Sequence, residues 1–165
     1  MILQEVASQL GSFLTYRKVS VFYTDLAAST TGGAALTLSL GNGNTYLSSV
    51  NSGNLVIPAG YWLVGVRMKL VAQFTGGSMG VLTASVGTVS GSGTNLIAAT
   101  DVLGATVGTV TSQAASVITT ANAITSLPAF TPVVVFTPTT YALSVLTAGQ
   151  LDIEFIYTNV STPGV

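Results

Sequence analysis

The stretch that decides the fold is Tyr-Trp-Leu-Val-Gly-Val-Arg-Met-Lys-Leu-Val-Ala-Gln-Phe, residues 61–74. Its even-numbered positions are all apolar: Trp62, Val64, Val66, Met68, Leu70, Ala72 and Phe74. Its odd-numbered positions are mixed and include two basic residues. Because successive side chains of a β-strand point to opposite faces, this pattern predicts a long strand whose even-numbered face lies on a core.

The same alternation recurs on both sides of this stretch. Residues 150–157 place Leu151, Ile153, Phe155 and Tyr157 on one face of a second predicted strand. Shorter runs predict strands at 18–26, 35–40, 54–57, 80–86, 133–137 and 141–146, separated by Gly-rich and Pro-containing turns. About eight short antiparallel strands predict an all-β fold, a β-sandwich or jelly-roll-like sandwich.

Two regions fit this pattern less well, and they set the predicted boundaries. Residues 17–165 are expected to form one sandwich domain, and residues 1–16 an N-terminal arm. Within the domain, residues 87–127 are rich in Gly, Ser, Thr and Ala and are predicted to be a loop-rich excursion. One interpretation of this excursion is a contact with another subunit, and the other is a poorly packed surface loop.

The arm places large apolar residues at helical spacing, namely Leu3, Val6, Leu10, Phe13 and Leu14. Leaving five such side chains in water is costly, so one interpretation is an arm that docks on a neighbouring subunit. The other interpretation is a frayed terminus. The first residues lack the basic start of a signal peptide, which indicates synthesis in a cytoplasm.

Charge is scarce along the whole chain. Only 5% of its 165 residues are charged, against about 25% in an ordinary soluble domain. Four basic residues are too few for binding nucleic acid or an anionic membrane surface. The chain has no His and no Cys, which removes the usual activating base and the usual zinc ligands. The sequence therefore predicts no enzyme, no catalytic or metal-binding residues and no cofactor.

One pair of carboxylates has a spacing that catalytic and metal-binding sites also use. Asp152 and Glu154 share a strand face about 7 Å apart, a spacing that could indicate a glycosidase pair, a calcium site or an unpaired wet surface. Arg67 and Lys69 have the same spacing on the other long strand. If the two strands are neighbours, opposite charges pair directly across them. We therefore predict a salt-bridge ladder of these four residues.

Several apolar side chains are predicted to face outward. Besides the apolar residues of the arm, the interface candidates are Tyr61, Leu63, Val71 and Ile156. Exposed apolar groups with few charges around them are typical of protein interfaces. A carbohydrate-binding or adhesin-like module is a second interpretation, since exposed aromatic platforms bind sugars in such modules and the six Tyr are spread along the chain.

The turns and strands of residues 55–160 also resemble a known family. The segments that carry the resemblance are 56–60, 63–70, 74–77, 82–88 and 146–153, which read VIPAG, LVGVRMKL, FTGG, LTASVGT and LTAGQLDI. They resemble the small β-sandwich virion proteins of tailed bacteriophages, in particular capsid decoration (cement) proteins. These motifs are structural, and residues 1–54 carry no resemblance.

The resemblance implies a structural protein on the outer surface of an icosahedral capsid. Its expected partners are the major capsid protein, whose neighbouring subunits it would clamp, and itself, as a homotrimer at three-fold positions. Other phage structural roles, as a coat protein, head fibre or tail component, stay open at this point. No nucleic-acid or membrane partner is expected.

Overall fold

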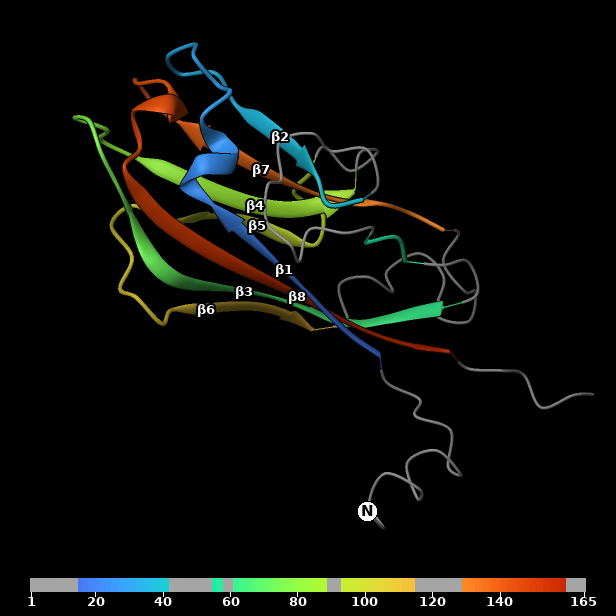
Figure 1. Ribbon diagram of the computed structural model, residues 1–165. Helices are drawn as coiled ribbons and strands as arrows, with labels where there is room; N and C mark the ends of the chain where they lie inside the picture. Colours follow the sequence, from blue (N-terminus) through green and yellow to red (C-terminus); the bar gives the residue numbers. More distant parts are fainter. Residues whose placement is uncertain (1–14, 42–54, 58–60, 89–92, 115–128, 160–165) are drawn as a thin grey trace, which may run out of the picture.

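The computed structural model describes residues 15–41, 55–57, 61–88, 93–114 and 129–159. These residues form two four-stranded antiparallel sheets that pack face to face (Figure 1). The first sheet has the order β1 (Thr15–Phe22), β8 (Ala148–Asn159), β3 (Tyr61–Thr75) and β6 (Val110–Ala114). The second has the order β2 (Leu36–Ser39), β7 (Pro132–Pro138), β4 (Leu82–Thr88) and β5 (Ile97–Asp101).

This strand order is that of a jelly roll. Strands near the two ends of the described chain, β1 and β8, are neighbours, and every pairing inside both sheets is antiparallel. The chain crosses between the sheets at most of its connections, and only β4 and β5 follow each other within one sheet. Eight strands wound in this way give the double Greek key of jelly-roll domains. The predicted all-β sandwich is confirmed.

The core lies between the sheets and is built from the inward faces of both. Met68, Leu70, Ile153 and Phe155 face it from the first sheet, and Phe136 from the second. Across the gap the rings of Phe74 and Phe136 lie 5.6 Å apart at 58°, a tilted arrangement that aromatic pairs favour. Two short 3₁₀ helices, η1 (Tyr23–Leu26) and η3 (Leu143–Val145), cover one end, each burying a leucine.

A β-bulge in β3 corrects one predicted orientation. Leu63 lies opposite Tyr157 of β8, but Gly65 lies opposite Ile156, so Val64 is an extra residue with no partner of its own. An extra residue reverses the alternation of side chains at that point. Leu63 is therefore in the core, 5% exposed, and Val64 is 37% exposed. The outward face predicted for Leu63 and the inward face predicted for Val64 are both wrong.

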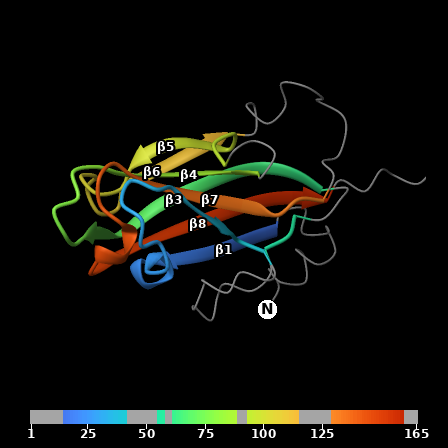
Figure 2. The ribbon, with the colours of Figure 1, turned by 90° about the horizontal axis from the view of Figure 1, so that it is seen from above.

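Other boundaries also differ from those predicted. The first strand begins at Thr15, so the last two residues assigned to the arm belong to the sandwich, while residues 1–14 lie outside the described residues. Residues 93–114, placed in the excursion, contain the edge strands β5 and β6 (Figure 2). Residues 141–146 contain η3 in place of a strand. Residues 55–57 form no strand but make an isolated bridge between Ile57 and Phe130.

Candidate functional site

The charges of this chain gather on one side of the sandwich. All four basic residues lie on β1 and β3, and two of the five acidic residues lie on β8 between these strands. Five side chains alternate with the core residues and so point outward from the first sheet. We call them the ionic face: Lys18, Arg67, Lys69, Asp152 and Glu154. The strands of the second sheet carry a single charged residue, Asp101 at the end of β5.

Strand register brings the four predicted ladder residues together. Because β3 and β8 are neighbours, Arg67 lies opposite Glu154 and Lys69 lies opposite Asp152. The guanidinium of Arg67 forms an ion pair with the Glu154 carboxylate. The second rung differs from the prediction, because Asp152 pairs with Lys18 of β1, whose Nζ lies 3.1 Å from Oδ2. The ionic face therefore spans three strands.

Asp152 holds β1 and β8 together through two side chains of β1, and a third hydrogen bond comes from its own strand. Its carboxylate accepts hydrogen bonds from the Ser20 hydroxyl at 2.7 Å, from the Gln150 amide at 3.0 Å and from the Lys18 ammonium at 3.1 Å. Burial alone raises the pKa of Asp152, but these hydrogen bonds and the charge of Lys18 outweigh it and hold the pKa below its ordinary value of 3.8. The carboxylate is thus ionised and fully engaged at neutral pH.

Asp152→Asn is expected to make the free energy of unfolding less dependent on pH at acidic pH. A carboxyl whose pKa is lower in the folded state stabilises that state above its unfolded pKa, and this stabilisation is lost as the pH falls through the folded pKa. The window therefore lies below about pH 4. In urea unfolding, the free energy of unfolding of the wild type should fall more steeply from pH 7 to pH 2 than that of the variant. At pH 7 Asp152→Asn should be less stable by about 1 kcal/mol. Parallel profiles would contradict this role.

Lys69 stands apart from these pairs. Its side chain is exposed, and among the described residues no hydrogen bond or ion pair reaches it. It borders a hollow of about 180 Å³ together with Arg67, Glu154 and Val110. Val110 begins the edge strand β6 and is 50% exposed. This hollow thus combines two cations, one carboxylate and an apolar side chain.

The structure describes the side chains of only three of the nine predicted interface residues. Leu3, Val6, Leu10, Phe13 and Leu14 lie outside the described residues, as does the side chain of Tyr61. Val71 and Ile156 are half-buried on β3 and β8, and Leu63 is in the core. The exposed apolar groups that the prediction missed include Tyr16 on β1, 61% exposed, together with Val107 and Val110. Tyr16 could have been found, because it lies two positions before Lys18 and so shares the outward face of that residue on β1.

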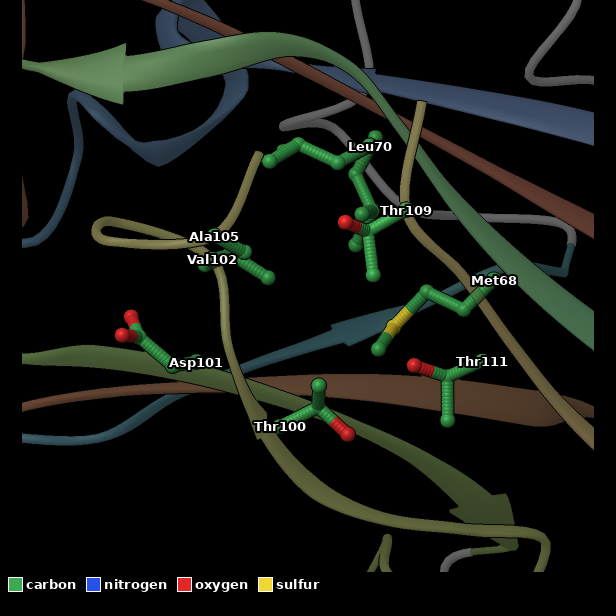
Figure 3. Close-up of a pocket in the computed structure, with 9 residues that line it drawn as sticks. Met68, Leu70, Thr100, Asp101, Val102, Ala105, Thr109 and Thr111 are labelled. Atoms are coloured by element: carbon green, nitrogen blue, oxygen red, sulfur yellow. The ribbon is translucent and has the colours of Figure 1, made fainter. Parts of the chain in front are cut away.

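The cavity beside β5 is too small to be a small-molecule site. Met68 and Leu70 of β3 face Thr109 and Thr111 around a cavity of only about 10 Å³ near the end of β5 (Figure 3). That volume is about the size of one water probe, far below the roughly 300–1,000 Å³ of small-molecule sites. The Asp101 carboxylate beside it accepts hydrogen bonds from the backbone N–H groups of Leu103 and Gly104.

The described part of the chain shows neither a metal-binding cluster nor a membrane-spanning helix. Within residues 15–41, 55–57, 61–88, 93–114 and 129–159, no group of three His, Cys, Asp or Glu side chains could hold a metal ion. In the same ranges the structure contains no helix with the length and apolar character needed to span a bilayer.

Comparison with known proteins gave only structural neighbours. No protein-family model and no curated protein matches the sequence. A chain of the cyanophage Pam1 capsid asymmetric unit is similar with a TM-score of 0.49 and 16% identity, covering 88% of this chain and 84% of its own.

Two further neighbours also come from phage capsids. A chain of the capsid of Ralstonia phage GP4 has a TM-score of 0.42 and 19% identity, covering 90% of this chain and 86% of its own. A chain of the acidic stable capsid of Helicobacter pylori bacteriophage KHP30 has a TM-score of 0.40 and 16% identity, covering 89% of this chain and 95% of its own. At these scores and identities the likenesses carry no weight for function, and the jelly roll stands on its own strand order.

Proposed function

We propose that this chain is a virion structural protein of the decoration type. It binds the outer surface of a capsid and stabilises contacts between major capsid subunits. It is made in the host cytoplasm and acts on the virion, with no catalytic step. Its partners are the major capsid protein and further copies of itself.

The observation that supports this proposal best is the distribution of charge on a jelly roll. Jelly-roll sandwiches build viral capsid domains as well as lectins and cupins, so the fold alone does not choose among them. Here five of nine charges lie on one face, and the strands of the opposite sheet present Thr, Ser and Val with Asp101 alone. A surface so poor in charge protects a free protein weakly against association and suits one that is covered after assembly.

We propose a homotrimer as the form in which this chain assembles. Closed cyclic symmetry lets a small chain bury apolar surface against copies of itself without forming an open fibre. Exposed Val64 and Val107 would gain from such burial. Three linked copies would also bind a repeating shell with far higher avidity than one copy.

Sedimentation with capsids tests the proposal. Capsids assembled without this protein should pellet it at saturable stoichiometry, whereas free major capsid subunits should not bind it. Light scattering of the free protein should give three times the 16.7 kDa chain mass. A stable monomer that ignores capsids would contradict the proposal, and self-assembly into closed shells would favour a coat-protein role.

The carbohydrate-binding alternative predicts neighbouring exposed aromatic side chains. Tyr16 and Tyr141 are both exposed, but they lie at opposite ends of the sandwich. Tyr16 is opposite Ile156, near the end of β8, whereas Tyr141 precedes the start of β8 at Ala148. Eight strand residues span about 26 Å, so these two rings do not form one sugar-binding platform.

A further inference from the structure

We propose that the ionic face is the surface that meets the partner protein, and that its hollow receives a carboxylate side chain of that partner between Arg67 and Lys69. The inference rests on the proposed function in that the partner is a capsid subunit. It goes further by naming the docking face, the chemistry of the contact and the residue that carries it.

Lys69 is the first reason. Its position opposite Asp152 would normally give it a cross-strand partner. Asp152 instead accepts hydrogen bonds from Lys18, Ser20 and Gln150. The other carboxylate of the face, Glu154, pairs with Arg67. Both acids of the face are thus engaged elsewhere, and the ammonium of Lys69 has capacity for an anion from outside.

The balance of charge is the second reason. The ionic face carries three cations and two anions, so it is positive by one charge on a chain whose net charge is −1. A surface of this sign steers and orients a partner that presents acidic side chains.

The shape of the hollow is the third reason. Its volume of about 180 Å³ suits a carboxylate and part of its stem and lies below the roughly 300–1,000 Å³ of small-molecule sites. Val110 on the rim offers an apolar contact to the methylene groups of an Asp or Glu side chain. Arg67 adds a planar donor, the kind that binds carboxylates best.

A second copy of this chain is a poorer source of that carboxylate. Among the described residues, Asp101 is the exposed acid outside the ionic face. Its Oδ1 already accepts hydrogen bonds from two backbone N–H groups, at 2.8 Å from Leu103 and 3.0 Å from Gly104. The other acid outside the face in the described ranges, Asp25, is buried. The charges of the described residues therefore favour a different protein as the partner.

The experiment compares Lys69→Gln and Lys69→Glu with the wild type in sedimentation with capsids over a range of NaCl concentrations. Thr37→Glu is the matched control, because it places the same charge on an exposed strand position of the opposite sheet. We expect affinity about tenfold weaker for Lys69→Gln and about a hundredfold weaker for Lys69→Glu, with Thr37→Glu near the wild type. Lys69→Gln should also make the affinity for capsids depend less on the NaCl concentration.

The outcomes separate the two proposals. If the wild type binds capsids but both Lys69 variants bind equally well, the docking inference is overturned and the proposed function stands. The same conclusion follows if Thr37→Glu loses binding while Lys69→Glu keeps it. If the wild type does not bind capsids at all, the proposed function falls and takes the docking inference with it. Thermal melts of each variant show that a loss of binding is not a loss of folding.

Discussion

Gly149→Ala is expected to destabilise the protein by about 3–4 kcal/mol. Gly149 adopts φ of +141°, a conformation that residues with a Cβ rarely take, which costs about 1–2 kcal/mol. An added Cβ would also overlap the ring of Phe74, and crowding a packed core costs about 1–3 kcal/mol. Phe74 cannot move aside easily, because it is fully buried against Phe136. Urea unfolding measures the loss.

Two further variants separate the strain from the clash. Gly108→Ala is the matched control, since Gly108 has φ of +91° but nothing within 4 Å of an added Cβ, and it should cost only about 1–2 kcal/mol. In a Phe74→Ala background the cost of Gly149→Ala should fall to that same level, because the ring is gone. Additive losses in this double-mutant cycle would show that the two residues are not coupled as described.

Leu63→Asp is expected to cost about 4 kcal/mol or more, enough to unfold a marginal domain. Leu63 is 5% exposed in the core, and a carboxylate there loses its water without gaining a described partner. Val64→Asp should change stability by less than about 1 kcal/mol, because Val64 is on the outside of the bulge. Plain alternation along β3 predicts the reverse order.

The adjacent pair is therefore a direct test of the bulge. Both variants add one carboxylate to the same strand, so effects of net charge and strand propensity are nearly matched. Thermal unfolding by circular dichroism, at equal concentration and pH, gives the comparison. A larger loss for Val64→Asp than for Leu63→Asp would show that β3 and β8 pair without the extra residue.

The sequence predicted the layers well because alternation is a local signal. The strands over 61–75 and 148–159 carry large apolar residues on one face, and the structure pairs them as the ladder required. The bulge at Val64 was not predictable, because Leu63 and Val64 are both apolar and neither signals a change of face. The edge strands β5 and β6 were missed because Ala and Ser have weak strand preference and tertiary pairing decides their state.

Local sequence patterns also predicted the charged site only in part. Equal spacing predicted cross-strand pairs between the two basic and the two acidic residues only if their strands were neighbours, which β3 and β8 are. It did not reveal that β1 lies on the other side of β8, which turns Asp152 toward Lys18 and leaves Lys69 for another partner. Which strands become neighbours depends on contacts between residues far apart in the chain. Lys18 and Asp152, for example, are separated by 134 positions in the sequence.

A cryo-electron microscopy map of capsids saturated with the wild-type protein tests the account most directly. Compared with capsids lacking the protein, it should show added density at three-fold positions outside the shell, each copy fitting the jelly roll with β1, β8 and β3 toward the capsid surface. An acidic side chain of the capsid should lie beside Lys69. Saturated samples whose map equals that of bare capsids would contradict the account.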